Sequence, residues 1–251
     1  MDEPTREPVV VFQDVWKAFG KNSIYEGVNL TVYRGETLTI VGGSGTGKSV
    51  LLKCLLRLLI PDRGEIYAFG EKVTGRTEEQ MVETRRRIGM LFQGAALFDS
   101  LSVRENVAYP LRVHGWKDED KISLRVAEVL DMVNLEGVEQ KMPSELSCGM
   151  KKRVGLARAI AIEPEVILYD EPTTGLDPTN VKRIDQMVID MQARLGVTSI
   201  VVTHDMGSAF RVSDRLAMLY DRKIVWAGPK SEIDRADHPI VKQFIDGNIG
   251  E

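Results

Sequence analysis

The stretch at residues 42–49 constrains this chain more than any other, because it matches the pattern G-x-x-x-x-G-K-S in full. It stands between an apolar run at 37–41 and a segment at 50–60 whose apolar residues have helical spacing. In such a strand–loop–helix context, backbone N–H groups of the glycine-rich turn point at phosphate oxygens, and the helix directs its positive dipole end at them. The same letters would arise by chance in about one chain in a hundred. The pattern therefore predicts a phosphate-binding loop.

The composition fits one large α/β domain, or one such domain with an inserted subdomain. The chain has 251 residues, of which 43% are hydrophobic and 28% charged, so it has enough apolar material for a core. The formal net charge of −4 argues against nucleic acid as the main partner, because nucleic-acid binders usually carry a basic face.

Neither secretion nor membrane insertion is predicted. The first eight residues are polar and acidic, unlike a signal peptide. The most apolar run, 50–60, is too short to span a bilayer and contains Lys53 and Arg57. Cys54 and Cys148 show no metal-binding spacing and no disulfide framework, which suits a reducing cytosol. We therefore expect any membrane connection to run through a partner.

Hydrophobic periodicity predicts an α/β body, a helical insertion and a return to α/β. Strands are expected at residues 9–12, 37–41, 65–67, 88–92, 166–169, 198–202, 216–220 and 223–226. Helices are expected at 50–60, stopped by Pro61, and at 121–133 and 180–194, with mostly helical structure over 97–161 and two short helices near the C-terminus. Continuous apolar runs such as 166–168 are typical of parallel strands buried on both faces.

Two carboxylates end the apolar strand predicted at 166–169. Asp170 would ligate Mg²⁺, and Glu171 would be the general base that polarises the attacking water. In the loop, Lys48 would contact the β- and γ-phosphates, and the Ser49 hydroxyl would also ligate Mg²⁺. The alternative for the carboxylates is a strand-end aspartate that caps a turn.

His204 and Gln93 each follow another predicted strand. In a nucleotide site, His204 would hydrogen-bond the γ-phosphate, and Gln93 would contact Mg²⁺ or the water. A packed or capping histidine and a loop glutamine are the alternatives, and spacing alone does not decide between them.

Together these motifs resemble the ATP-binding-cassette (ABC) nucleotide-binding domain over about residues 9–244. Residues 146–150, Leu-Ser-Cys-Gly-Met, are similar to the family signature LSGGQ, and residues 174–177 to its D-loop. By the same resemblance, His204 is the switch histidine and Gln93 belongs to the Q-loop.

The resemblance implies an α/β fold of the P-loop NTPase cassette type in one domain, 8–246. A RecA-like core with an antiparallel β region would occupy 8–93 and 162–246, and a helical subdomain 94–161.

The implied cofactors are ATP and Mg²⁺. Phe19 takes the place of the aromatic that stacks on adenine, and a core aromatic is its alternative. The residues implied to contact ATP are Phe19, Gly42, Gly43, Ser44, Gly45, Thr46, Gly47, Lys48, Ser49, Ser147, Gly149 and Asp177. The implied metal ligands are Ser49, Gln93 and Asp170, and the implied catalytic residues are Glu171, His204 and Gln93.

Two signature positions depart from the family pattern. Cys148 replaces a glycine, and we interpret it as a small space-filling residue rather than a redox switch. Met150 replaces a glutamine, and a signature ending in Met is similar to that of ATPases serving Mla-type phospholipid transporters, which pair with MCE-domain proteins. The stretches 94–101, 105–111 and 141–146 resemble the same subfamily.

Ser147 is predicted to cap a helix that runs over about 150–162. Lys151, Lys152 and Arg153 fall in its first turn, where each cation opposes the helix dipole by about 0.3–1 kcal/mol. A bound anion would offset this penalty. The alternative is that the three side chains extend into water.

In the family, the helix end at the signature binds the γ-phosphate of ATP held by the other subunit. With one phosphate-binding loop and one signature per chain, the resemblance therefore implies a head-to-tail homodimer that closes on two ATP molecules. The segment 94–114 would dock on an MlaE-like integral membrane permease. Its apolar residues Leu97, Phe98, Leu101, Val103 and Val107 would face that partner, or else the chain's own core.

The resemblance thus places the chain peripherally on the cytoplasmic face of the inner membrane, where it would power lipid movement to a periplasmic carrier. An MCE-domain protein and a small regulatory subunit are further candidate partners. The alternatives are an ATPase for amino-acid or other small-solute import or lipoprotein release, a soluble ABC protein of DNA repair or translation, and a nucleotide binder without hydrolysis.

Overall fold

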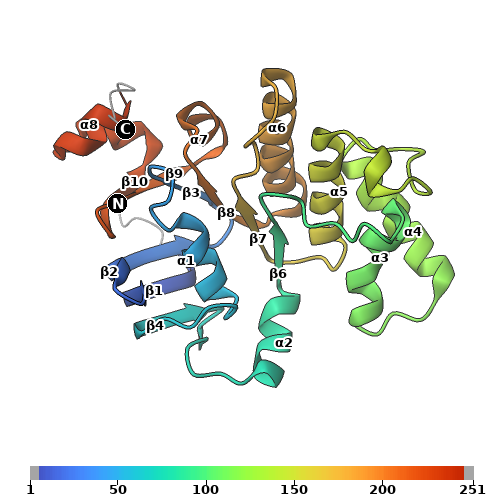
Figure 1. Ribbon diagram of the computed structural model, residues 1–251, viewed down its shortest axis with the longest axis horizontal. Helices are drawn as coiled ribbons and strands as arrows, with labels where there is room; N and C mark the ends of the chain where they lie inside the picture. Colours follow the sequence, from blue (N-terminus) through green and yellow to red (C-terminus); the bar gives the residue numbers. More distant parts are fainter. Residues whose placement is uncertain (1–5, 246–251) are drawn as a thin grey trace. The chain divides into compact units, whose positions relative to one another are not determined.

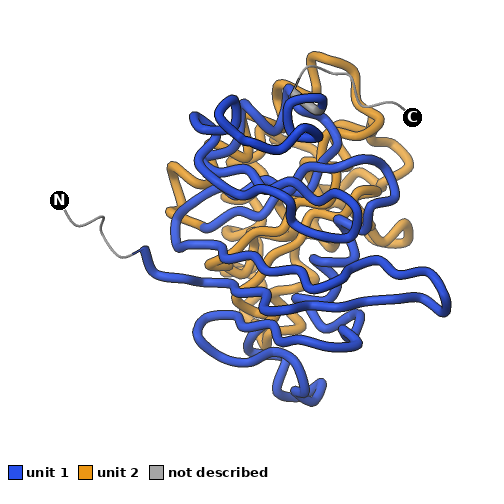
Figure 2. Tube along the Cα trace, turned by 90° about the vertical axis from the view of Figure 1, so that its left-hand side faces the viewer, with its two compact units in different colours: residues 1–84, 198–251 blue, residues 85–197 orange. Residues whose placement is uncertain are grey.

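The computed structural model describes residues 6–245. The chain forms two compact units, shown in different colours in Figure 2. The first holds the residues up to Thr84 and from Thr198 onward, and the second is Arg85–Val197. The predicted end of the domain, residue 246, lies outside the described residues, and the predicted subdomain limits at 94 and 161 remain predictions.

An antiparallel sheet opens the first unit, as the resemblance implied. Its strand order is β2-β1-β4-β5, with β1 Pro8–Phe19, β2 Asn22–Tyr33, β4 Arg63–Ala68 and β5 Glu71–Lys72. Val9, Val10, Phe12 and Val15 of β1 are buried and give the sheet an apolar face. A two-residue turn at Gly20, whose φ is 60°, joins β1 to β2.

Parallel strands form the other sheet region of the first unit. Strand β3, Thr37–Val41, pairs in parallel with β8, Thr198–Thr203, and with β9, Arg215–Tyr220; β10, Lys223–Pro229, adds antiparallel to β9. All residues of β3 and β8 are buried, which agrees with the continuous apolar runs in their sequences.

Helix α1, Lys48–Leu55, ends earlier than the predicted limit at residue 60. Arg57 takes a left-handed conformation, with φ 55°. Its N–H bonds to the Cys54 carbonyl at 3.0 Å, and the Leu58 N–H bonds to the Lys53 carbonyl at 2.9 Å. These two bonds form a Schellman motif, which stops the helix before Pro61 can.

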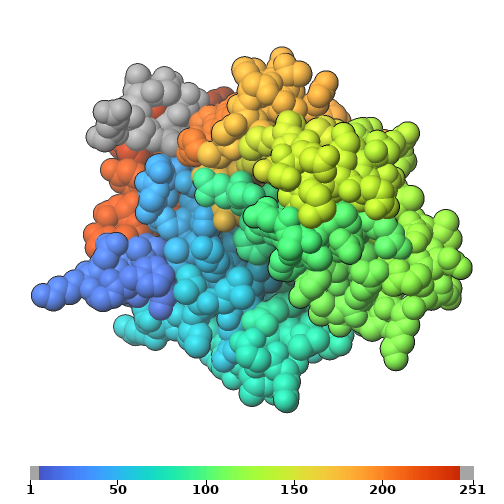
Figure 3. Space-filling model, turned by 45° about the vertical axis from the view of Figure 1, so that its right-hand side comes forward, coloured from blue at the N-terminus to red at the C-terminus, as the bar shows by residue number. Residues whose placement is uncertain are grey.

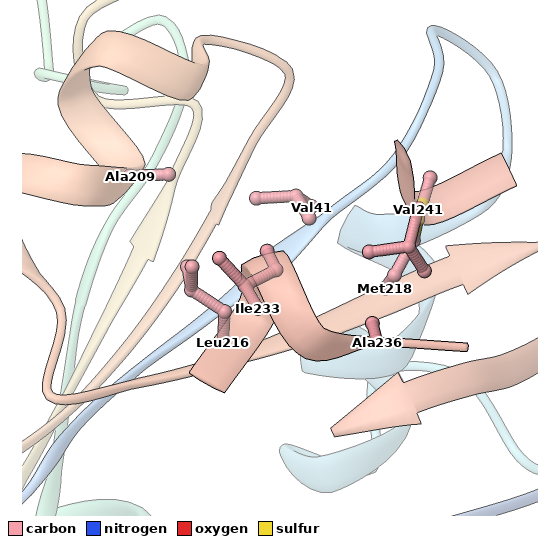
Figure 4. Close-up of a cluster of buried hydrophobic side chains, with 7 residues drawn as sticks. All are labelled: Val41, Ala209, Leu216, Met218, Ile233, Ala236 and Val241. Atoms are coloured by element: carbon pink, nitrogen blue, oxygen red, sulfur yellow. The ribbon is translucent and has the colours of Figure 1, made fainter. Parts of the chain in front are cut away.

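The C-terminal elements pack against strands β3 and β9. They are α7 Met206–Val212, the 3₁₀ helix η2 Lys230–Arg235 and α8 Pro239–Ile245. Figure 4 shows the buried cluster that joins them to β3 and β9, which comprises Val41, Ala209, Leu216, Met218, Ile233, Ala236 and Val241. This packing fixes the strand end from which the phosphate-binding loop departs.

The second unit combines two parallel strands with a group of helices. Strands β6, Ile88–Leu91, and β7, Val166–Asp170, are buried throughout. The helices that follow or precede them are α3 Val103–Val113, α4 Glu119–Met132, η1 Pro143–Glu145, α5 Cys148–Ile160 and α6 Pro178–Leu195. Helices α3, α4 and α5 lie side by side (Figure 1). Helix α2, Glu78–Arg86, precedes β6.

Over residues 6–245, we find no helix with both the length and the apolar character needed to cross a bilayer.

Candidate functional site

The phosphate-binding loop leaves the end of β3 and runs into α1. A Cβ on Gly42 would lie 2.5 Å from the Leu219 carbonyl oxygen, and a Cβ on Gly47 would lie 2.4 Å from the Ile24 Cγ2. Gly47 also has φ 99° and is the N-cap of α1. These two positions therefore accept only glycine, for steric and conformational reasons that agree with the motif.

Lys48 lies inside the loop with only 5% of its surface exposed. Its Nζ donates to the carbonyl oxygens of Gly42 and Gly43 at 2.9 Å each. The Thr46 hydroxyl donates to the Gly43 carbonyl at 3.0 Å and closes the turn. A nearly buried ammonium inside a glycine-rich turn at a helix N-terminus is an arrangement suited to the phosphate groups of a nucleotide.

Tyr25 is a residue of this region that the sequence analysis missed. It is fully buried in β2, and its hydroxyl donates to the carbonyl oxygen of Gly47. Burial raises the pKa of the phenol well above its usual value, so the hydroxyl stays protonated and able to donate. No local sequence signal marks this contact, since the two residues are 22 positions apart.

Phe19 and His204 both lie at the surface of the first unit. Phe19, at the end of β1, is 47% exposed, and the Lys17 Nζ lies 5.3 Å from its ring centroid. The alternative of a core aromatic is therefore wrong, and stacking on adenine remains a prediction. His204 follows β8 and is exposed, while Asp205 caps α7 by accepting from the Ser208 N–H at 3.1 Å. The exposure of His204 contradicts the packed alternative, and Asp205 rather than His204 caps α7.

In the second unit, two buried carboxylate residues end β7, as the sequence predicted. Asp170 and Glu171 are 5% and 8% exposed. Glu171 has φ 46°, in the left-handed region that residues other than glycine seldom adopt. The Thr174 hydroxyl donates to its Oε2 at 3.0 Å. Strained backbone of this kind is concentrated at functional sites, and here it coincides with the predicted general base.

Ser147 caps α5, as predicted, although the helix begins at Cys148 rather than near residue 150. The Ser147 Oγ accepts from the Met150 N–H at 3.3 Å. Cys148 is exposed, whereas Gly149 is buried. A Cβ on Gly149 would lie 2.9 Å from Oδ1 of Asn180, so α5 and α6 approach closely at this point.

Asp177 lies beside the same contact. Its carboxylate accepts from the N–H groups of Thr179 and Asn180 at 3.0 and 3.1 Å, and from the Asn180 side-chain amide. The hydrogen bonds from Asn180 and then Thr179 lower the pKa of Asp177. Gly149 and Asp177 are thus brought together through Asn180, a residue that the motif analysis did not identify.

Because α5 begins at Cys148, Lys152 and Arg153 lie in its second turn rather than in the predicted first turn, and neither side chain simply extends into water. Lys152 is buried, and its Nζ donates to the Glu171 carbonyl oxygen at 3.0 Å. Arg153 donates to the carbonyl oxygens of Val133 and Asn134 at 3.5 and 2.8 Å, at the C-terminal end of α4, where a cation is favourable. Desolvation lowers the pKa of both side chains. The alternative of three solvated side chains is therefore wrong for these two.

The segment after Gln93 divides between core and surface. Gln93 itself is exposed after β6. Val103 and Val107 are fully buried, so the expectation that they face a partner is wrong. Phe98 and Tyr109 are exposed, with ring centroids 4.7 Å apart. Figure 3 shows the surface of this part of the chain in green.

An apolar groove of about 320 Å³ adjoins these two rings. Its lining includes Met90, Phe92, Phe98, Tyr109, Pro110 and Ile162. Arg158 of α5 also lines the groove and donates to the carbonyl oxygens of Ala95 and Ala96 at 2.8 and 2.7 Å. Both alanines have positive φ, 61° and 47°. The guanidinium therefore holds a strained turn between Gln93 and the groove.

Comparisons with known proteins agree with this geometry. The family described as "ABC transporter" matches residues 25–174. The chain is 39% identical to the intermembrane phospholipid transport system ATP-binding protein MlaF of Escherichia coli, over 95% of this chain and 89% of that protein. It is 42% identical to protein TRIGALACTOSYLDIACYLGLYCEROL 3, chloroplastic, of Arabidopsis thaliana, over 98% of this chain and 76% of that one.

Two further similarities bear on cargo and assembly. The probable ribonucleotide transport ATP-binding protein mkl of Mycobacterium tuberculosis is 42% identical over 92% of this chain, which spans only 64% of that protein. A dimeric structure of the ATP-binding cassette MJ0796 in a post-hydrolysis state, bound to ADP and Pi, superimposes with a TM-score of 0.81. It is 32% identical and covers 88% of this chain and 98% of that one.

Proposed function

The chain belongs to the ABC transporter family of ATPases, and from this premise we propose that its ATP hydrolysis drives phospholipid transport between two membranes. The observation that carries the proposal is the match to MlaF, which extends over nearly the whole of both chains. The name of the mkl relative makes ribonucleotide transport the rival, although this chain spans a smaller part of that protein.

We assign the binding and the hydrolysis of ATP to residues of each unit in turn. In the first unit, the loop 42–49 with Lys48 would bind the ATP phosphates, and His204 would hydrogen-bond the γ-phosphate. In the second, Glu171 would accept a proton from the attacking water at its carboxylate, which the Thr174 hydroxyl orients through Oε2.

Mg²⁺ is the cofactor we assign to this chemistry. When bound, it would neutralise charge on the β- and γ-phosphates. The Ser49 hydroxyl, the Asp170 carboxylate and the Gln93 amide are the groups we assign to it. The described part of the chain holds no cluster of three or more His, Cys, Asp or Glu residues suited to a metal. These oxygen donors, with one carboxylate among them, fit Mg²⁺, which usually binds through one or two carboxylates together with phosphates and water.

We infer that two copies pair head to tail around two ATP molecules. The capped N-terminus of α5, with Ser147 and the buried Gly149, would face the γ-phosphate held by the partner subunit. The dimeric cassette with ADP and Pi supports this assembly. The pairing predicts that Glu171→Gln binds ATP, accumulates as a closed dimer and does not hydrolyse. Lys48→Ala, which removes the ammonium of the loop, should weaken both binding and hydrolysis.

The apolar groove beside Phe98 and Tyr109 is the surface we assign to a helix of the membrane permease. Two exposed aromatic rings over a concave apolar floor are typical of an interface for an apolar partner segment. The chain would then lie peripherally on the cytoplasmic face of the inner membrane. An MCE-domain carrier and a small regulatory subunit would complete the assembly.

The deciding experiment reconstitutes the chain with its permease and carrier in liposomes that contain a fluorescent phospholipid. We expect ATP-dependent transfer of the lipid, and none with Glu171→Gln. Parallel vesicles loaded with radiolabelled ribonucleotide test the rival cargo. Movement of the ribonucleotide without movement of lipid would overturn the lipid assignment while leaving the ATPase intact.

A further inference from the structure

Lys152 occupies a position in α5 that is unfavourable for a lysine. Only 2% of its surface is exposed, and it lies just after the first turn of the helix. Burial of an ammonium is costly, and desolvation is the main cause that lowers its pKa. An apolar side chain such as Met would fill similar space without this penalty, so packing does not explain the lysine.

The contact that Lys152 makes is with the backbone of the predicted general base. Its Nζ donates to the Glu171 carbonyl oxygen at 3.0 Å, across 19 positions of sequence. The Thr174 N–H reaches the same oxygen at 3.3 Å. The Glu171 peptide therefore has its carbonyl fixed from a second element, α5.

Glu171 needs such support because its φ of 46° is unfavourable for a residue with a Cβ. The direction of its side chain depends on this backbone conformation. A relaxed backbone would turn the carboxylate away from the position in which Thr174 holds it. A small displacement of a general base is enough to slow proton transfer markedly.

We propose that Lys152 is a positioning residue for ATP hydrolysis, whose hydrogen bond to the Glu171 carbonyl holds the general base in its left-handed conformation. The inference rests on the proposed role of Glu171. The same hydrogen bond joins α5, the helix that Ser147 caps, to the proposed general base Glu171 of the same subunit.

The test compares Lys152→Met with Lys152→Gln. Met keeps the volume but cannot donate, whereas the Gln amide donates without a charge. For Lys152→Met we expect kcat to fall by about 10-fold with the KM for ATP unchanged, because the contact affects the base and not the phosphate loop. Its melting temperature should stay equal or rise, since a buried charge is removed. Lys152→Gln should retain kcat within about 3-fold.

Lys121→Met is the matched control, because Lys121 also lies near the start of a helix of the second unit but is exposed. Its kcat should equal that of the unsubstituted protein. A normal kcat in Lys152→Met, or a Lys152→Gln variant that is folded but as slow as the Met variant, would overturn the inference. If Lys152→Met does not fold, the kcat of the Gln variant decides alone.

The Glu171→Gln variant distinguishes a failure of the role of Lys152 from a failure of the proposed function. If Glu171→Gln hydrolyses ATP at the normal rate, the base assignment fails. If it is inactive while Lys152→Met is fully active, only the role of Lys152 fails. When Lys152→Met is added to Glu171→Gln, we expect no further loss of residual rate and unchanged ATP-induced dimer formation. An additive loss would indicate a general structural role for Lys152 and contradict positioning.

Discussion

The hydroxyl of Tyr25 donates to the carbonyl oxygen of Gly47, so the loop residue that caps α1 is held by a side chain from strand β2. The same carbonyl accepts from the Val50 and Leu51 N–H groups at 2.7 and 3.3 Å. The loop therefore derives its shape from two elements: the helix that follows it and the antiparallel sheet.

Tyr25→Phe removes only the hydroxyl and tests this support. We expect the free energy of unfolding to fall by about 1 kcal/mol, the typical contribution of one hydrogen bond. The KM for ATP should rise by about 3-fold as the loop loses order, with a smaller change in kcat. Urea denaturation and steady-state kinetics measure the two effects. Tyr67→Phe, which removes a partly exposed hydroxyl from β4, is the control, and equal KM values in all three proteins would contradict the role of Tyr25.

Much of the fold could be predicted where burial is continuous. Strands β3 and β7 were found because every residue in them is buried, which gives uninterrupted apolar runs. Strand β2 was missed because Gly27, with φ 79°, interrupts its alternation. Helix α2 was missed because only Met81 and Thr84 are buried in it, so it has almost no apolar stripe.

In the candidate site, too, some residues could be predicted from the sequence and others could not. The loop 42–49 and the Asp170–Glu171 pair were predicted because their chemistry requires fixed residue types at short spacing. Tyr25, Lys152 and Asn180 were not, because their contacts with Gly47, Glu171 and Gly149 join residues from different elements. Such contacts depend on how strands and helices pack, which local sequence does not encode.

Gly149→Ala should disturb the start of α5. The added Cβ would lie 2.9 Å from Oδ1 of Asn180, whose amide is held by Asp177 and cannot easily turn away. We expect a loss of about 1–3 kcal/mol in the free energy of unfolding and a fall of about 10-fold in kcat. Nucleotide binding by the single subunit should not change, because the loop 42–49 is untouched. Cys148→Ala, at the exposed neighbouring position, is the control, and a Gly149→Ala protein with normal stability would show that the contact relaxes freely.

The cap of α6 predicts a defined pH dependence. Hydrogen bonds from Asn180 and Thr179 lower the pKa of Asp177 below its usual 3.8. The cap's contribution to stability is therefore present above pH 3.8, where Asp177 is ionised in both states, and is lost as the pH falls through the lower pKa of the folded protein. Asp177→Asn keeps a capping side chain that does not titrate. The difference in unfolding free energy between the two proteins should be largest at pH 7 and should shrink toward pH 3. A difference that is constant over this range would exclude the carboxylate as its source.

The two cysteines should react very differently with a thiol reagent such as dithionitrobenzoate. Cys54 is buried in α1, and this burial raises the pKa of its thiol to about 11, so at pH 8 it is both shielded and protonated. Cys148 is exposed at the start of α5. We expect one thiol per native chain to react rapidly, two after unfolding in urea, and none rapidly in native Cys148→Ala.

In the Glu171→Gln protein, ATP with Mg²⁺ should slow the labelling of Cys148, because the proposed closed dimer covers the N-terminus of α5 with the partner's nucleotide. Equal labelling rates with and without ATP would contradict that closure, whereas rapid labelling of Cys54 in the native chain would contradict its burial.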